Sequence, residues 1–366
     1  MDIPFHHSTE AQPGDRGHGL GAAQADRIAS NWAIYARLFE VTAGLSEDDT
    51  RRFGAEAFDR IGGFAPELAE EIEGIARGSG RATEEIAALN ARTELLAAGG
   101  HECSVIACMG TVTRSGDPIG VQTWDWHDEL ADGWMHWRID HADGRRVDTM
   151  TEAGIVAKLG VSSAGVGLLM NILGHAQDGP PLGVPVHVLN RAVLDRSPNG
   201  VDAITMLANA PMSASSSVTI VAPDGDGGVV CTVELSPAGP GFVTPDLRGV
   251  LVHTNHFLEQ PGRSGDTAVR EAPNTVLRLD HAHRSMARIP DGEVDADAIV
   301  AAMDSHRGGG PGGICCHPAP GAPFGDRWRT LATVIVEPAG ARMTLRRNGP
   351  CGHERLPQFA AGAAAR

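Results

Sequence analysis

Cys103 is the residue best placed for covalent chemistry, because it stands where the character of the chain changes. The pattern before it is helical, and for about 70 residues after it the pattern is that of short strands. A cysteine nucleophile needs a base, and no histidine follows in a context typical of papain-like proteases. Cleavage before Cys103 would free an α-amine with a pKa of ~7.7–8.0 to serve as that base. The alternative is a small buried hydrophobic residue, as free cysteines commonly are.

Asp125 is the carboxylate we associate with Cys103. It lies between Trp124 and Trp126, and strand alternation sends it to the face opposite both rings, where it could stabilise the cationic amine. An aspartate that caps a turn is the alternative. Counting a hairpin about Gly116 leaves Asp125 about four residues, or roughly 13 Å, out of register with Cys103. A bulge or a longer loop must close that gap.

Four further polar residues are candidates for the site. Asn255, at the end of a predicted strand, offers amide donors suited to an oxyanion hole, and a turn asparagine is the alternative. Asn171 interrupts the apolar run LLMNIL and either lines a pocket or is a satisfied core amide. Arg327 and Arg329 precede a predicted strand, where a guanidinium beside the thiol would favour the thiolate and bind a carboxylate. A solvated loop arginine is the alternative for both.

The elements that must position these residues follow from periodicity and turn signals. Residues 1–20 are polar and glycine-rich, and we expect His6, His7 and His18 to be solvent-exposed or loosely packed. Helices are predicted at about 22–39, 48–61, 66–78, 83–98, 185–196, 202–209, 273–288 and 296–305. Strands are predicted at 104–114, 119–126, 133–140, 145–151, 216–222, 228–235, 249–257, 330–337 and 342–347, with two more inside 155–173. Composition and periodicity support a layered α+β protein, with a helical segment over 1–102 and a catalytic segment over 103–366.

Charge and cysteine usage exclude several classes of function. The formal charge of −16 repels nucleic acid and anionic membranes. We find neither an apolar run of about 18–20 residues nor a signal peptide, and expect a cytoplasmic protein. Six cysteines are too scattered for a disulfide framework. Cys315, Cys316 and His317 suggest zinc, but adjacent cysteines lack the usual spacer and no second pair is visible, so we expect no metal.

The chain resembles one family through motifs in a fixed order. These are NARTELL (90–96), ECSVIA (102–107), RSGDPIGVQTWDW (114–126), VHTNHF (252–257), SHRGGGPGGICCHP (305–318) and TLATVIVEP (330–338). They are similar to the isopenicillin-N acyltransferase family of self-cleaving N-terminal nucleophile (Ntn) hydrolases. The resemblance implies a four-layer αββα sandwich, an oxyanion-hole role for Asn255, and an active-site arginine at Arg327 or, second, Arg329. It implies no cofactor.

One position departs from the family pattern. Members that cleave themselves commonly have glycine before the cysteine, whereas this chain has Glu102. Strained backbone promotes the initial attack on the preceding carbonyl, and glycine reaches such geometry more easily than glutamate. Either the glycines at 99 and 100 provide slack, or Glu102 assists hydrolysis of the thioester.

We therefore predict an autoprocessed cysteine amidohydrolase that cleaves a small N-acyl compound and whose two chains stay associated after cleavage at Glu102–Cys103. Transfer of the acyl group from an amide or acyl-CoA to an amine is the alternative. An unprocessed protein that binds a small molecule or partner without chemistry is a third interpretation. The sequence does not identify the amide or the oligomeric state.

Overall fold

Two β-sheets form the centre of the protein. The computed structural model describes residues 2–96, 103–306 and 312–353. Over these residues the larger sheet has the order β1-β4-β5-β6-β7-β8-β9-β10, and the smaller has the order β11-β2-β3-β12-β13. All neighbours are antiparallel except β1 and β4, which are parallel. No helix in the described ranges is long and apolar enough to cross a membrane.

The strands have the following bounds. In the larger sheet they are β1 (Phe5–Ser8), β4 (Trp134–Asp140), β5 (Arg146–Glu152), β6 (Leu159–Ser162), β7 (Gly167–Ile172), β8 (Ser216–Ala222), β9 (Val229–Leu235) and β10 (Gly241–Val243). In the smaller sheet they are β2 (Ser104–Cys108), β3 (Ile119–His127), β11 (Val250–His253), β12 (Trp328–Glu337) and β13 (Arg342–Arg347).

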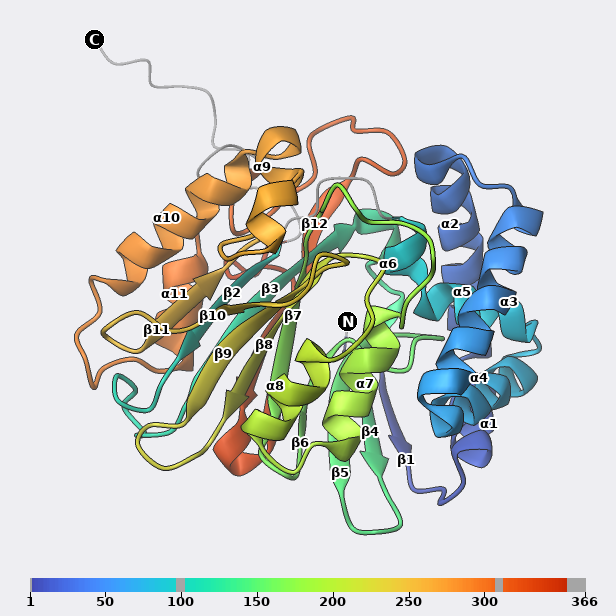
Figure 1. The fold of residues 1–366 in the computed structure, drawn as a ribbon, viewed down its shortest axis with the longest axis horizontal. Coiled ribbons are helices and arrows are strands. Elements are labelled where there is room, and N and C mark those ends of the chain that lie inside the picture. Colours follow the sequence, from blue (N-terminus) through green and yellow to red (C-terminus); the bar gives the residue numbers. More distant parts are fainter. Residues whose placement is uncertain (1, 97–102, 307–311, 354–366) are drawn as a thin grey trace.

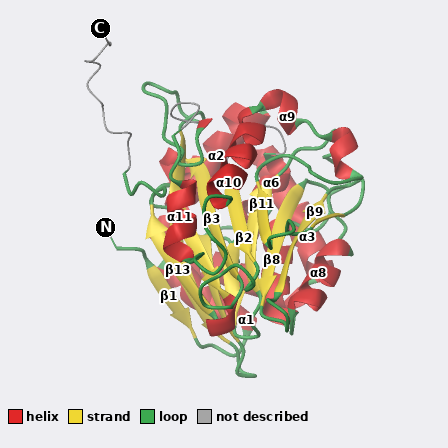
Figure 2. Ribbon diagram, turned by 90° about the vertical axis from the view of Figure 1, so that its left-hand side faces the viewer, coloured by secondary structure: helices red, strands yellow, loops and turns green. Residues whose placement is uncertain are grey.

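Helices pack on the outer faces of both sheets and at one side of them. They are α1 (Pro13–Ala23), α2 (Ala25–Ala43), α3 (Glu47–Phe64), α4 (Pro66–Ser79), α5 (Thr83–Asn90), α6 (Arg92–Leu95), α7 (Val186–Arg196), α8 (Gly200–Ala208), α9 (Ala268–Glu271), α10 (Asn274–Met286) and α11 (Ala296–Met303). Helices α7 and α8 pack on the larger sheet, and α10 and α11 on the smaller one, in front of whose strands they lie in Figure 2. Figure 1 shows α1–α5 gathered at one side of the sheets. This is the four-layer αββα sandwich expected from the sequence, and that prediction is confirmed.

Most predicted elements are present. The Asp143-Gly144 turn joins β4 to β5, and the apolar stretch from Ile155 divides into β6 and β7. No element was predicted in the first twenty residues, and the structure has β1 and most of α1 there. Strand β1 pairs with β4, so the N-terminal segment contributes to the larger sheet as well as to the helical block.

Helix α1 has no strong periodic pattern of apolar residues, and it packs on α4 through glycines instead. A Cβ on Gly17 would lie 2.0 Å from the carbonyl oxygen of Glu71, and one on Gly74 would lie 2.2 Å from that of Gly14. Gly21 and Gly78 make equally close approaches. The backbones of α1 and α4 therefore touch directly, which only residues without a side chain allow.

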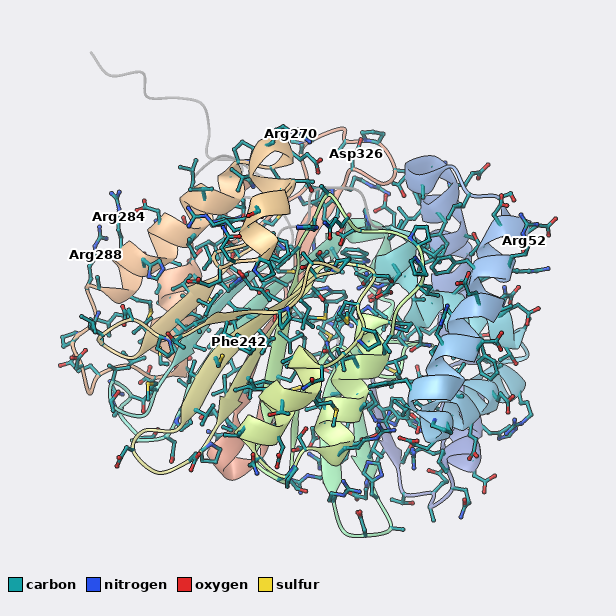
Figure 3. The ribbon with its side chains drawn as sticks, viewed as in Figure 1. Arg52, Phe242, Arg270, Arg284, Arg288 and Asp326 are labelled. Carbon is teal, nitrogen blue, oxygen red and sulfur yellow. The ribbon has the colours of Figure 1, made fainter. Side chains whose placement is uncertain are left out.

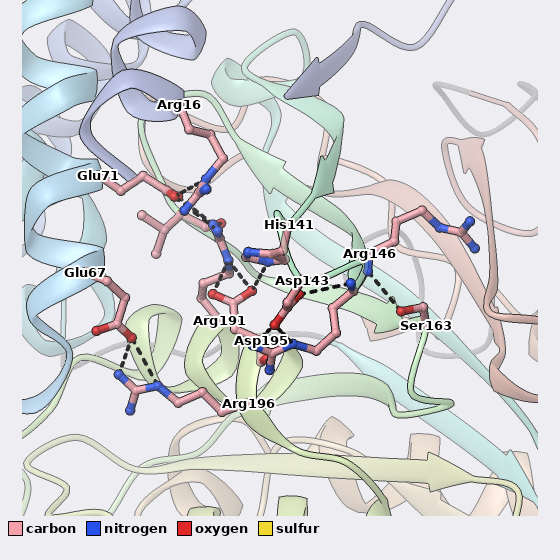
Figure 4. A network of polar contacts seen from close by, with 12 residues as sticks. Arg16, Glu67, Glu71, His141, Asp143, Arg146, Ser163, Arg191, Asp195 and Arg196 are labelled. Carbon is pink, nitrogen blue, oxygen red and sulfur yellow. Dashed lines mark hydrogen bonds and ion pairs between the residues drawn. The ribbon is translucent and has the colours of Figure 1, made fainter. Parts of the chain in front are cut away.

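A buried network of ion pairs joins the helical block to the larger sheet (Figure 4). Arg191 on α7 donates to both carboxylate oxygens of Glu71 on α4, at 2.6 and 3.1 Å, and neither side chain is exposed. Arg16 on α1 donates to the same carboxylate at 2.5 Å. Arg191 also donates to Asp195 at 2.9 Å, and Arg196 pairs with Glu67 nearer the surface. Residues on either side of position 103 are thus held together by charge as well as by apolar packing.

The glycine contact predicts a large asymmetry between two Gly→Ala substitutions. Gly17→Ala should lower the free energy of unfolding by about 1–3 kcal/mol, because its methyl group would overlap the α4 backbone. Gly63→Ala, on α3 where a Cβ would contact nothing within 4 Å, should leave stability unchanged or raise it by about 0.5–1 kcal/mol. Chemical denaturation of both variants checks this, and equal effects would contradict the close approach.

Candidate active site

Cys103 lies immediately before β2, and the pairing of β2 with β3 determines which residues lie next to it. The register runs from Ser104 opposite Thr123 to Cys108 opposite Ile119, so Cys103 falls opposite Trp124 and next to Asp125. The centre of the hairpin is the bond between residues 113 and 114, because the connecting loop runs from residue 109 to residue 118. The register counted about Gly116 was therefore wrong. The side chain of Cys103 is 5% exposed, and its Sγ lies 3.8 Å from the main-chain oxygen of Asp125.

The main chain of Cys103 is held on both sides by side chains. Its N–H donates to Asn255 Oδ1 at 2.8 Å, and its carbonyl oxygen accepts from Arg278 Nη1 at 2.8 Å. Arg278 Nη2 also donates to Asn255 Oδ1 at 3.0 Å, while Asn255 Nδ2 donates to the carbonyl of Ile172 at 2.9 Å. These partners fix the orientation of the amide, since the opposite orientation would set its NH₂ group against two donors. The structure therefore brings Cys103, Asp125 and Asn255 together.

Arg278 is a site residue that the sequence analysis missed. It lies on α10, is 2% exposed, and reaches Ser104 Oγ at 3.0 Å as well as Cys103 and Asn255. The signal was available: Arg278 shares the inward face of α10 with Thr275, Ala282 and Met286. An arginine on the buried stripe of an amphipathic helix requires a polar partner, and here the partners are the main chain of Cys103 and the side chains of Ser104 and Asn255.

The thiol of Cys103 faces a small pocket between the sheets. Its lining residues are Arg92, Trp124, Asp125, Trp126, Lys158, Met170 and Ile172, and its volume is about 10 Å³, room for about one water molecule. The Lys158 ammonium lies 4.1 Å from the centre of the Trp124 ring, and the Arg92 guanidinium 4.0 Å from that of Trp126. Both cations pair with the fully buried Glu152. Two buried cations and two indoles thus line the space beside Sγ.

The environment of the intact chain keeps the thiol protonated. Burial, then the Asp125 carboxylate, raises the pKa of Cys103 to about 12, although Arg278 and Lys158 act in the opposite direction. Burial and Arg92 lower the pKa of Lys158 to about 7, although Glu152 acts to raise it. Because the thiolate is the nucleophile, Cys103 needs a base or a further positive charge to react near neutral pH.

The other predicted residues lie in different surroundings. Asp125 is fully buried and stands opposite Thr330 of β12. Asn171 accepts a hydrogen bond from Ser217 at 3.4 Å, and alternates along β7 with Met170 and Ile172, which line the pocket. Among the described residues, the group of side chains spaced to hold a metal ion excludes Cys103.

The two predicted arginines make ion pairs beyond the pocket lining. Arg327 donates to Glu129 at 2.9 Å, and Arg329 donates to Asp128 at 2.7 Å and to Asn348 at 2.9 Å. Neither is among the residues that line the pocket around Cys103. Their role in the site stays a prediction, and Arg278 is the arginine in contact with Cys103. Glu102 lies outside the described residues.

Comparisons with known proteins identify relatives. The family model described as acyl-coenzyme A:6-aminopenicillanic acid acyl-transferase matches residues 112–350. A curated relative, the 40 kDa form of acyl-coenzyme A:6-aminopenicillanic-acid-acyltransferase from Emericella nidulans, is 26% identical over 356 residues, covering 94% of this chain and 93% of its own. Among solved structures, penicillin V acylase from Agrobacterium tumefaciens matches with a TM-score of 0.40 at 12% identity, over 67% of this chain and 83% of that one.

The buried carboxyl of Glu94 should make the stability of the protein depend on pH. Its Oε1 accepts from the Val186 N–H at 2.9 Å, tying α6, which carries Arg92, to α7. Burial raises the pKa of Glu94 from 4.5 to about 7, so its contribution to stability is complete below pH 4.5 and is lost as the pH rises through 7. Glu94→Gln retains the acceptor without the charge and should raise stability above pH 7 by up to about 3 kcal/mol. Denaturation at pH 5 and pH 8 checks this, and an equal change at both pH values would contradict it.

Proposed function

This chain belongs to the acyl-coenzyme A:6-aminopenicillanic acid acyl-transferase family, and from that premise we propose that it is an N-terminal-cysteine amidohydrolase that matures by cutting its own Glu102–Cys103 bond. The family resemblance predicted from the sequence motifs is confirmed. The chain is an enzyme, either a hydrolase acting on amide C–N bonds or a related N-acyltransferase. We propose the hydrolase as the first of these two activities.

One observation carries the proposal: the backbone nitrogen of Cys103 already has an acceptor suited to an amine. It donates to Asn255 Oδ1 at 2.8 Å inside the protein. After cleavage the same nitrogen becomes an α-amine with an ordinary pKa of ~7.7–8.0, beside its own thiol. An amine in that place can accept the thiol proton, and it supplies the base that the high thiol pKa of the intact chain requires.

The maturation step balances with water alone. Sγ of Cys103 attacks the carbonyl carbon of Glu102, the C–N bond breaks, and the nitrogen takes the thiol proton, which leaves a thioester and a free α-amine. Water then hydrolyses the thioester and releases the Glu102 carboxylate. Catalysis repeats the same chemistry: Sγ bonds to the acyl carbon of the substrate, the amine leaves with a proton, and water releases the acid.

Each residue near Cys103 has a role in this scheme. Asn255 holds the amine through Oδ1; one hydrogen of its Nδ2 group is donated to the carbonyl of Ile172, and the second is the donor that we propose for the oxyanion hole. Asp125 orients the amine as its counter-charge. Arg278 fixes the carbonyl of Cys103, and together with Lys158 it favours the thiolate.

The pocket favours a small acyl group. Trp124, Met170 and Ile172 give it apolar walls, and about 10 Å³ of free space in the intact chain requires the site to open before a substrate enters. The buried ion pair between Glu71 and Arg191 supports lasting association of the two chains after cleavage, since its members lie on opposite sides of the cut.

Acyl transfer to an amine is the second candidate. The Emericella nidulans relative is an acyltransferase by name, and the same acyl-enzyme serves either outcome. Whether water or an amine takes the acyl group decides between the two activities. Product analysis with a competing amine distinguishes them.

Self-cleavage is tested by the intact mass of the purified chain. The wild type should give fragments of 102 and 264 residues, and Cys103→Ala should stay uncut and inactive toward small N-acyl amides. Cys108→Ala, which changes a buried cysteine five positions along the same strand pair, is the matched control and should cleave. An uncut wild type would overturn the α-amine mechanism and favour a non-catalytic binding protein or a cysteine enzyme with another base.

A second prediction separates Arg278 from the arginines chosen by sequence. Arg278→Met should slow self-cleavage and turnover by about 10²–10³, because it removes a charged donor at Cys103. Arg284→Met, on the exposed side of α10 (Figure 3), is the control and should retain activity.

Arg327→Met completes this set and should retain at least about a third of the activity, because its charge pairs with Glu129. A loss confined to Arg327→Met would show that the arginine nearest Cys103 in the structure is not the functional one. Thermal unfolding of each variant excludes simple loss of the fold.

A further inference from the structure

Four side chains that can ligate a metal meet far along the chain from Cys103. They are His306, Cys315, His317 and Cys351, whose ligand atoms all lie within 4.8 Å of one another. Cys315 and His317 are buried, whereas His306 and Cys351 are partly exposed. They come from two segments: His306, Cys315 and His317 lie between α11 and β12, and Cys351 lies after β13.

Hydrogen bonding alone does not account for this arrangement. Nε2 of His317 lies 3.2 Å from Nε2 of His306, 3.5 Å from Sγ of Cys351 and 3.6 Å from Sγ of Cys315. An imidazole nitrogen either donates one proton or offers one lone pair, so it cannot bond to all three. A single cation at the centre of the group would attract all four atoms at once.

Four of the six distances between ligand atoms can be compared with the edges of a zinc tetrahedron. With Zn–S of about 2.3 Å and Zn–N of about 2.05 Å, the edges are about 3.8 Å between sulfurs, about 3.3 Å between nitrogens and about 3.6 Å between sulfur and nitrogen. The structure gives 3.4 Å for the two sulfurs, 3.2 Å for the two nitrogens, and 3.5 and 3.6 Å for His317 with the two sulfurs. The two distances from His306 to the sulfurs are within 4.8 Å.

The surroundings favour positive charge at this group. Nδ1 of His306 lies 3.9 Å from the Asp304 carboxylate, which is beyond hydrogen-bond distance but close enough for electrostatic attraction. The main-chain N–H of His353 donates to Cys351 Sγ at 3.4 Å, which suits a sulfur carrying negative charge.

We propose that His306, Cys315, His317 and Cys351 bind one Zn²⁺ in a closed structural site. Two thiols lose their protons on binding, so the bound ion and its ligands are neutral overall. Four protein ligands leave no open position for substrate, which distinguishes the site from a catalytic one. The inference does not depend on the function proposed above, and it replaces the sequence expectation of no metal. The fold supplies the remote ligands His306 and Cys351 that the spacing argument lacked.

The test measures metal in the purified full-length chain. After incubation with Zn²⁺ and gel filtration, the wild type should retain one zinc per chain, and Cys351→Ser should retain at least about tenfold less. Cys316→Ser is the matched control: it changes the buried cysteine adjacent to a ligand but outside the group, and should keep its zinc. Zinc retained by Cys351→Ser, or absent from the wild type, would overturn the proposal.

Cobalt keeps the test decisive if Cys351→Ser fails to fold. Co²⁺ added to the metal-free wild type should give the visible absorption of a tetrahedral ion and a thiolate charge-transfer band. A disulfide between Cys315 and Cys351 is the alternative to metal binding. The mass of the intact protein under non-reducing conditions detects it, since a disulfide would lower the mass by two hydrogen atoms. That disulfide, or an octahedral cobalt spectrum, would refute the site. Removal of zinc by a chelator should also lower the melting temperature of the wild type and leave that of Cys351→Ser unchanged.

Discussion

The buried carboxylate of Glu71 is the point on which the assembly of the protein depends. A charge without solvent exposure is tolerated only when it is fully paired, and Glu71 has Arg191 on one side and Arg16 on the other. Those partners bring α1, α4 and α7 to a common point, where glycines let the backbones of α1 and α4 touch. The helical block is therefore fastened to the larger sheet at a place independent of the peptide bond before Cys103.

A second buried carboxylate, Glu152, organises the wall of the pocket. It gathers Arg92, Lys158 and Tyr35, and the two cations lie against Trp124 and Trp126. The same packing that places positive charge near Cys103 also removes water from its thiol, and the loss of water dominates the pKa of Cys103. The thiol of the intact chain is thus buried and protonated, and in the mechanism that we propose a new amine at Cys103 would supply the base without a change of fold.

The sequence was sufficient for features encoded locally. Turn signals such as Asp143-Gly144 located hairpins, and the switch from helical to strand pattern located Cys103. Features that depend on contact between distant segments were missed: α1 is defined by its fit to α4, and the β2–β3 register depends on loop length. Arg278 was hidden within an ordinary helical pattern, because its importance comes from packing against residues 103 and 255.

The group of His306, Cys315, His317 and Cys351 is another feature that could not be predicted from local sequence. Its members are separated by up to 45 residues, from His306 to Cys351, and no local spacing rule unites them. Thr330 links the segment that carries three of them to the surroundings of Cys103. Thr330 accepts from the N–H of Cys316 through its hydroxyl at 2.8 Å, donates its own N–H to the carbonyl of Cys316 at 3.0 Å, and stands opposite Asp125 on β3. A zinc ion bound as we propose would fix Cys315 and His317, and through Thr330 it would also fix the position of Asp125. The geometry at Cys103 and the stability of the two segments would then depend on the same small group of atoms.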